Sequence, residues 1–169
     1  TLKNLVKAFK CAFEKSYSTA YRYESLDFQA ITTLYDATTD SFVNEIIIGN
    51  LGTKELTEVG REERYLYDRP PVYYDSENPE KKLLQHHYDK TVTVFGKLPK
   101  SAIRIPKYTG GTTSPDFVFV IDGAQNKIIY LFVETKADNM RDSDKLAIAI
   151  QDYFFNSLEN HNIVYQVAT

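Results

Sequence analysis

Two short polar segments, each at the edge of an apolar run, hold the residues of this chain that could do chemistry together. Asp116 opens the apolar run Phe-Val-Phe-Val-Ile, and Glu134 and Lys136 close a second run, Ile-Ile-Tyr-Leu-Phe-Val. Successive side chains of a strand alternate between its two faces, so Glu134 and Lys136 would share a face and Thr135 would take the other. If the two runs pair as strands, Asp116 can join the cluster.

Two carboxylates and an ammonium group beside a hydrophobic sheet favour metal-assisted hydrolysis of a phosphodiester. Carboxylate oxygens are hard ligands that suit Mg²⁺ or Mn²⁺. A metal ion held by Asp116 and Glu134 would acidify water and neutralise charge on the phosphate. Lys136 would orient that water and stabilise the developing negative charge. The alternative, on spacing alone, is a strand-end ion pair between Lys136 and one of the two acids.

A further acidic group is expected from a helix that precedes the sheet. Glu77 and Glu80 lie at the start of this predicted helix. One of them, for which we favour Glu80, would point into the cluster and hold a second metal ion or its water ligand. The alternative is structural, because glutamate in a first helical turn is stabilised by the helix dipole.

Basic residues gather in the segment before Asp116. Four cations have no acid between them: Lys97, Lys100, Arg104 and Lys107. They could contact DNA phosphates or form a solvated basic face. Arg141 and Lys145 begin the helix after the Glu134 strand and would extend the same patch. Gln151, farther along that helix, would reach the site as a hydrogen-bonding residue or remain exposed.

The elements that must position these residues follow the order α-β-β-β-α-β, an α/β pattern, from about residue 72 onward. A helix is predicted from Asn78-Pro79 to about Tyr88, since proline is tolerated in a first helical turn. Asp122-Gly123 opens the turn between the two strands of the candidate site. The remaining predictions are strands at 91–95, 116–121, 127–135 and 163–167, an extended piece at 102–105 and a helix at 142–158.

The first 71 residues have a less regular pattern. Apolar residues at helical spacing predict an amphipathic helix at 2–15. Asp40-Ser41 is expected to cap a short helix that ends at Gly49. The charged stretch 53–69 is expected to be a solvated helix or a connector, and Pro70-Pro71 then punctuates the chain.

Composition describes an ordinary globular protein. The 169 residues suffice for one domain with a core, and 43% are apolar and 25% charged. No apolar stretch approaches the roughly 20 residues that span a bilayer. The single cysteine, Cys11, excludes an internal disulfide framework, so a reducing, cytoplasmic setting is expected. A chain that begins at Thr1 without an apolar leader is expected to be a fragment or a processed product.

Net charge and the absence of several common motifs limit the functions that this chain could have. The net charge is −3, whereas a protein that grips DNA unaided usually has a basic surface. Either the chain does not bind nucleic acid, or its affinity comes from a local patch or from other domains. Three histidines and one cysteine do not favour a zinc or Cys-His mechanism. The stretch from Gly49 to Lys54 lacks the spacing of a phosphate loop, and the sequence contains no Gly-x-Ser-x-Gly elbow.

Longer runs around these residues carry a resemblance to a known family. They are Val-Phe-Gly-Lys-Leu-Pro-Lys at 94–100, Ile-Arg-Ile-Pro at 103–106, the glycine-rich stretch leading to Pro-Asp-Phe-Val at 110–118, and Val-Glu-Thr-Lys at 133–136. Tyr-Asp-Ser-Glu at 74–77 and Glu80 fit the helix before the sheet. These runs resemble the C-terminal endonuclease domain of the restriction subunit of type III restriction enzymes. The resemblance covers about residues 72–168.

That resemblance implies a PD-(D/E)XK restriction-endonuclease-like core, with a mixed central sheet flanked by helices. It implies a catalytic set of Asp116, Glu134 and Lys136 with assistance from Glu80. The implied cofactor is Mg²⁺, for which Mn²⁺ could substitute, and the main-chain carbonyl of Thr135 is the expected third ligand. The product would carry a 5′-phosphate.

The resemblance also implies a larger assembly around this chain. Residues 1–71 would be a mainly helical connector after a helicase-like motor, and residues 72–169 the nuclease domain. The motor would use ATP, which this chain would not bind. The implied partners are double-stranded DNA and a modification subunit that methylates it, with no membrane. Two alternatives remain: a non-catalytic interaction module with the same fold, and another PD-(D/E)XK nuclease of repair or recombination.

Overall fold

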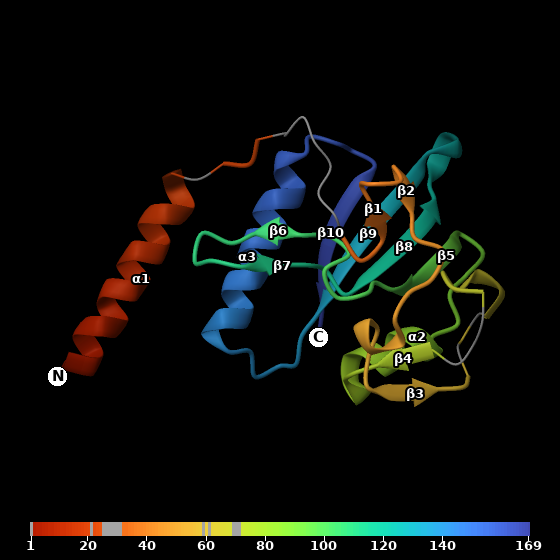
Figure 1. The fold of residues 1–169 in the computed structure, drawn as a ribbon, viewed down its shortest axis with the longest axis horizontal. Helices are drawn as coiled ribbons and strands as arrows, with labels where there is room; N and C mark the ends of the chain where they lie inside the picture. The colour runs from red at the N-terminus through yellow and green to blue at the C-terminus, as the bar shows by residue number, and fades with distance from the viewer. Residues whose placement is uncertain (1, 21, 25–31, 59, 61, 69–71) are drawn as a thin grey trace.

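The computed structural model describes residues 2–20, 22–24, 32–58, 60, 62–68 and 72–169; within the first helix, side chains are described only for residues 2–9, 11 and 12. A mixed four-stranded sheet forms the centre of the molecule, with a long helix along one side and short elements on the other (Figure 1). Among the described helices, none combines the length and apolar character needed to cross a bilayer.

The central sheet brings together strands from the second half of the chain in the order β10-β9-β8-β5. Its members are β5 (Val92–Lys97), β8 (Phe117–Asp122), β9 (Ile128–Thr135) and β10 (Ile163–Ala168). Strand β8 is antiparallel to both β5 and β9, whereas β10 is parallel to β9. The four strands predicted at 91–95, 116–121, 127–135 and 163–167 are therefore confirmed, and so is the α/β class.

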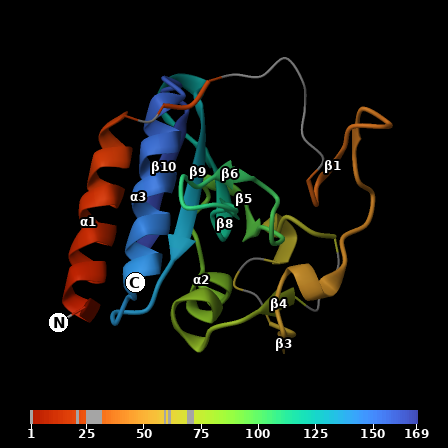
Figure 2. The same cartoon turned by 60° about the vertical axis from the view of Figure 1, so that its left-hand side comes forward.

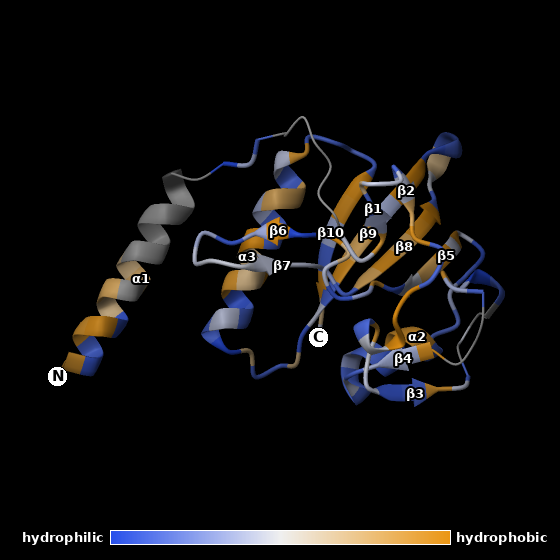
Figure 3. Cartoon of the chain, in the orientation of Figure 1, coloured by the Kyte–Doolittle hydropathy of each residue, from blue (hydrophilic) through white to orange (hydrophobic). Residues whose placement is uncertain are grey.

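Two apolar clusters cover the two faces of this sheet. One contains Phe95, Phe117 and Val133 from the strands, packed against Leu84 and Tyr74. The other places Ile150 and Phe155 of α3 (Asp142–Ser157) against Phe132 and Tyr165. Residues 132 and 133 thus face opposite clusters, as strand alternation requires. The central strands are largely apolar along their length, whereas the loops and turns around them are more hydrophilic (Figure 3).

A short strand pair ties residues 48–58 to the rest of the domain. Strand β3 (Lys54–Leu56) pairs with β4 (Val72–Tyr74), and a 3₁₀ turn, η1 (Ile48–Asn50), precedes it. The backbone N–H of Lys100 donates to the carbonyl of Asn50 at 2.8 Å. Leu56 lies in the same apolar cluster as the sheet. The division that we predicted between residues 71 and 72 therefore runs between paired strands, while Pro70-Pro71 lies outside the described residues.

The segment before the sheet is more irregular than the predicted helix 78–88. It consists of a π-helical turn, η3 (Glu77–Lys81), that continues into α2 (Lys82–Gln85) and then stops because His86 is extended. The piece predicted at 102–105 does not join the central sheet. Its end forms β6 (Ile105–Pro106), which pairs with β7 (Thr112–Thr113) as a separate hairpin. Turn η4 (Ala124–Asn126) links β8 to β9.

The N-terminal region contains one long helix and little regular structure after it. Helix α1 (Leu2–Ala20) includes the predicted 2–15 helix. It lies beyond α3 from the sheet in Figure 1, and Figure 2 likewise shows α1 on the outer side of α3. The predicted helix that ends at Gly49 is wrong. The structure has β1 (Tyr35–Asp36) paired with β2 (Ser41–Phe42) there, followed by η1, and η2 (Glu62–Arg64) lies farther on.

Candidate active site

Strand pairing brings the residues at the edges of the two apolar runs to one end of the sheet. Phe117 is opposite Val133 in the β8–β9 ladder, and the N–H of Asp116 extends this ladder by donating to the Val133 carbonyl at 3.0 Å. Asp116 therefore lies beside the end of β9, where Glu134 and Thr135 stand. Because β9 is paired on both sides, this end is fixed by the sheet and not by a loop.

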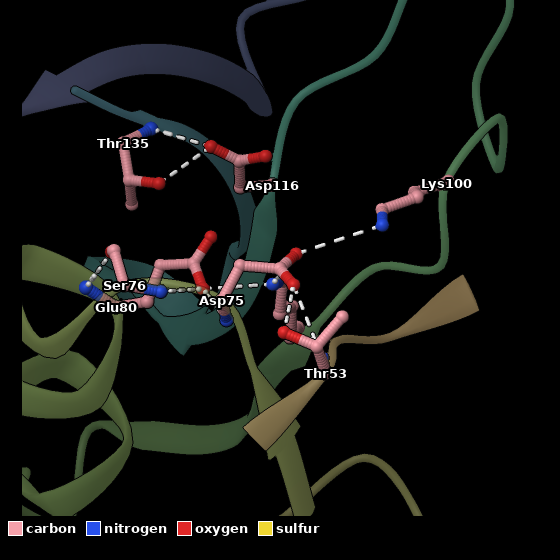
Figure 4. Close-up of polar contacts among 8 residues, drawn as sticks. Thr53, Asp75, Ser76, Glu80, Lys100, Asp116 and Thr135 are labelled. Atoms are coloured by element: carbon pink, nitrogen blue, oxygen red, sulfur yellow. Dashed lines mark hydrogen bonds and ion pairs between the residues drawn. The ribbon is translucent and has the colours of Figure 1, made fainter. Parts of the chain in front are cut away.

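Asp116 is held by Thr135, which lies between Glu134 and Lys136 in the chain. Its Oδ2 accepts hydrogen bonds from the backbone N–H of Thr135 at 2.8 Å and from the Thr135 hydroxyl at 2.6 Å (Figure 4). Burial raises the pKa of Asp116, and the charge of Glu80 raises it further, against the lowering effect of the Thr135 bonds. The carboxylate is thus well oriented but electrostatically unfavourable without a compensating cation.

Glu134 is buried, with 3% of its surface exposed, and both of its oxygens have partners. Its Oε1 lies 2.6 Å from the Lys136 ammonium, and its Oε2 accepts from the Gln151 side-chain nitrogen at 3.0 Å. Burial first, and then the charge of Asp116, raise the pKa of Glu134 to about 7. Burial alone would lower the pKa of Lys136, but the bond to Glu134 and the negative charges of Glu134, Asp116 and Asp144 together outweigh it, and the pKa is raised. Lys136 therefore remains an ammonium group.

The two glutamates of the preceding turn occupy different environments. Glu80 is 6% exposed, and its charge reaches Asp116. Glu77 is exposed and pairs instead with Lys54 at 3.2 Å and Lys81 at 2.9 Å. The structure thus places Glu80, and not Glu77, beside the candidate site.

Glu80 has two charged neighbours that the sequence did not predict, Asp75 and Lys97. Its Oε2 accepts from the backbone N–H groups of Asp75 at 2.6 Å and Ser76 at 3.2 Å, and from the Lys97 ammonium at 2.8 Å. Figure 4 shows Asp75 and Glu80 next to each other, near Asp116. Lys97 is 3% exposed, which differs from the basic surface that we expected it to join. Nothing in the local sequence showed that Asp75 and Glu80 would face it.

The other predicted DNA contacts lie mostly on the surface. Lys100, Arg104, Arg141 and Lys145 are exposed, and Lys107 is half-buried in the turn between β6 and β7. Arg141 caps α3 and pairs with Asp144 at 3.0 Å. Gln151 differs from these, because it is fully buried and donates to Glu134 and, at 2.8 Å, to the Thr113 hydroxyl. Thr113 is a neighbour of the site that sequence reasoning missed.

A pocket of about 230 Å³ opens next to Asp116. It is bordered by acidic, basic and hydroxyl side chains, which include Asp75, Lys97, Lys100, Ser101, Thr113 and Asp116. Such a lining suits a charged, hydrated ligand better than an apolar one.

Comparison with known proteins places this geometry in a family. The family model described as "Endonuclease domain" matches residues 63–169, which contain every residue of the candidate site. The chain belongs to this endonuclease-domain family. No solved structure gives a significant match.

Curated relatives of this endonuclease domain confirm the resemblance to type III restriction enzymes. The chain is 42% identical, over 99% of its length, to the type III restriction-modification enzyme StyLTI Res subunit of Salmonella typhimurium. It is 32% identical, over 62% of its length, to the EcoPI Res subunit of Escherichia phage P1 and to the EcoP15I Res subunit of Escherichia coli. The matched parts make up only 17% of the Salmonella protein and 10% of each of the others.

The donor atoms of this endonuclease domain fit one hard divalent cation. Asp116 and Glu134 supply carboxylate oxygens, and Thr135, whose main-chain carbonyl is the expected third ligand, directly follows Glu134 in the chain. Among the described residues, no three side chains of His, Cys, Asp or Glu form a cage for a metal. Mg²⁺ does not need such a cage, because it is usually held by one or two carboxylates, water and substrate phosphate. The Oε1 of Gln151 is a buried oxygen without a partner among the described residues, so the site also has an unused acceptor.

Proposed function

We propose that this chain is the Mg²⁺-dependent endonuclease domain of a type III restriction enzyme and hydrolyses phosphodiester bonds of double-stranded DNA. The observation that carries the proposal is the junction of Glu134, Lys136 and Asp116 at neighbouring strand ends, with the Lys136 ammonium 2.6 Å from Glu134. The domain match and the Res-subunit relatives support the same conclusion.

The fold that we propose is the PD-(D/E)XK core. Its support is the sequence of elements from η3 to β10, which gives α-β-β-β-α-β along the chain once the separate β6–β7 hairpin is set aside. The sheet is mixed, with its only parallel pair formed by β9 and β10 among the strands of the central sheet. The acidic and basic side chains gather where β8 begins and β9 ends.

Asp116 and Glu134 would hold the metal ion, together with the Thr135 carbonyl. When bound, Mg²⁺ would neutralise charge on the scissile phosphate and acidify water. The other roles in the reaction belong to side chains of the protein. Thr135 fixes the Asp116 carboxylate through two hydrogen bonds, and Gln151 fixes Glu134 from the other side. Lys136 orients the attacking water and stabilises negative charge as it develops on the phosphate.

Water oxygen forms the new bond to phosphorus, and the bond to the 3′ oxygen breaks. The water proton passes to solvent, and the 3′ oxygen takes up a proton to leave as a hydroxyl. The product strand keeps the phosphate on its 5′ end. Exposed cations around the pocket, of which Lys100 borders it directly, would contact the flanking phosphates.

The proposed partners follow from the share of the relatives that this chain represents. Most of each Res subunit lies outside the match, so an ATP-driven, helicase-like motor is proposed for that remaining part. A separate modification subunit would supply sequence recognition and much of the DNA affinity. This division would explain how a chain with a net charge of −3 can act on DNA in the cytoplasm.

The test is cleavage by the Res subunit that carries this segment, assembled with its modification subunit and supplied with ATP and Mg²⁺. Lys136→Ala is expected to slow cutting by about 10²–10³-fold, as for removal of one preorganised charge-stabilising group, and Asp116→Ala to abolish it. Lys127→Ala is the matched control, since Lys127 is an exposed lysine just before the same strand. Cutting by the Asp116→Ala assembly at the wild-type rate would refute the proposal.

A non-catalytic module with the same fold is the rival reading. It predicts that Asp116→Ala and Lys127→Ala behave alike in every assay, including Mn²⁺ binding by calorimetry. The Lys136–Glu134 ion pair fits either reading. The two hydrogen bonds from Thr135 that orient the buried Asp116 carboxylate beside this pair support an active site instead.

A further inference from the structure

The Lys97 ammonium is an unusual neighbour for a metal site because it is buried among acids. It lies 2.8 Å from Glu80 and 3.2 Å from Asp75, with only 4% of its side chain exposed. It reaches this place from the end of β5, whose partner strand β8 begins immediately after Asp116. Lys97, Asp75 and Asp116 border the same pocket. A fixed positive charge therefore occupies the acidic side of the site.

The acids around Lys97 have already used much of their capacity to accept. Oδ1 of Asp75 accepts from the backbone and hydroxyl of Thr53, both at 3.1 Å, and Oδ2 faces Lys97. Oε2 of Glu80 has three donors, namely the N–H groups of Asp75 and Ser76 and the Lys97 ammonium. Partial burial would raise the pKa of Asp75, but the charge and hydrogen bond of Lys97, with smaller effects of Lys100 and Thr53, together outweigh it and the pKa is lowered. Asp75 therefore stays ionised beside the lysine.

The formal charges of the whole cluster match a single divalent cation. The acidic members are Asp75, Glu80, Asp116 and Glu134, and the two buried or half-buried cations are Lys97 and Lys136. When all are ionised, four carboxylates and two ammonium groups leave two negative charges, which one divalent cation neutralises. Lys100 is 3.7 Å from Asp75, but its side chain is 61% exposed and its charge is screened by water.

We propose that the Lys97 ammonium takes the place of a second divalent cation next to Asp75 and Glu80, so that this endonuclease domain works with a single metal ion. The inference rests on the proposed function, because it assumes that Asp116 and Glu134 hold the first ion. It also assigns Glu80 a role: it holds Lys97 and does not bind metal. Lys97 is a positioning residue. It supplies a fixed positive charge, so that no second metal ion has to be bound next to Asp75 and Glu80.

The test is the number of Mn²⁺ ions bound per 169-residue chain, measured by calorimetry and by the loss of the free-Mn²⁺ electron paramagnetic resonance signal. One ion is expected for the wild-type chain and for Glu80→Gln, and none at this site for Asp116→Ala. Lys97→Met uncovers Asp75 and Glu80 and should bind two ions. Lys100→Met is the matched control, because it removes an ammonium that also faces Asp75 but is exposed, and it should still bind one.

Thermal unfolding supplies a second readout that a purely structural lysine would not give. Lys97→Met without metal should melt below the wild type, because buried acids lose their partner. Mn²⁺ should restore most of this loss, and should no longer do so when Glu80→Gln is added to Lys97→Met. If Lys97→Met does not fold, the wild-type and Glu80→Gln stoichiometries decide alone.

The possible outcomes distinguish a failure of the single-metal inference from a failure of the proposed endonuclease function. Two ions on the wild-type chain, or loss of an ion in Glu80→Gln, would overturn the single-metal inference and leave the endonuclease proposal intact. Lys97→Met that binds one ion and is not stabilised by Mn²⁺ would also overturn it. An ion that survives Asp116→Ala would instead count against the proposed catalytic metal site.

Discussion

The buried carboxylate of Glu134 should make the stability of this domain fall as pH rises toward neutrality. Its pKa in the folded chain is raised from the ordinary 4.5 to about 7, by burial and by the charge of Asp116. Between these values the folded state binds more protons than the unfolded state. The stabilising effect is therefore complete below about pH 4.5 and is lost as pH rises through about 7. Since one pKa unit is worth about 1.4 kcal/mol, the loss is roughly 3 kcal/mol.

The assay is urea unfolding in chelator at pH values from 5 to 8, followed by fluorescence or circular dichroism. The wild-type free energy of unfolding should decline over this range, and Glu134→Gln should remove most of the decline. Glu77→Gln is the control, because the pKa of Glu77 is lowered to about 2 by its bonds to Lys81 and Lys54, below the range tested. The histidines are the same in all three chains and cancel in the differences.

Two results would refute this reasoning. One is a wild-type stability that does not fall between pH 5 and 8. The other is an equal fall in Glu134→Gln, which would assign the titration to another group. Added Mg²⁺ should stabilise the wild type most at the alkaline end, because metal ligands must be deprotonated, and should have little effect on Glu134→Gln.

Three further predictions concern packing and the hydrogen bonds of the site. Phe95→Ala removes a fully buried ring from the apolar cluster on one face of the sheet and should cost about 3–5 kcal/mol in urea unfolding. Gly52→Ala would place a Cβ 2.5 Å from the β4 backbone and should lower the melting temperature, whereas Gly49→Ala, with no atom within 4 Å of the new carbon, should not. Gln151→Met removes a bond that lowers the pKa of Glu134, so carbon NMR of that carboxyl should show the pKa raised further, and an unchanged titration would contradict the bond.

The central sheet and α3 could be predicted because their sequences carry the information locally. Apolar runs of strand length, a turn signal at Asp122-Gly123 and a helical repeat in 142–158 agree with the elements that form. The meeting of Glu134 with Lys136 follows from strand alternation, and the approach of Asp116 follows once the two strands pair. These parts of the site depend on neighbours in the chain or on one hairpin.

Long-range contacts decide the parts that could not be predicted. Strand β3 is short and polar on one side, so nothing in Lys-Glu-Leu shows that it will pair with β4. Lys97 has no adjacent acid, and its partners Asp75 and Glu80 come from an earlier turn. The predicted helix before Gly49 failed because β1–β2 pairing and a 3₁₀ turn use those residues instead. Propensity is a weak guide when tertiary contacts compete with it.

The pairing of β3 with β4 determines where a transferable fragment of this endonuclease domain must begin. A chimera that joins it to a foreign DNA-reading protein at residue 63, where the family match begins, would discard β3 and Thr53. Thr53 donates twice to Asp75, and Asp75 in turn faces Lys97. A shorter graft would thus loosen the charge arrangement around Lys97 while leaving Asp116, Glu134 and Lys136 in place. A portable cutting unit should begin before Ile48.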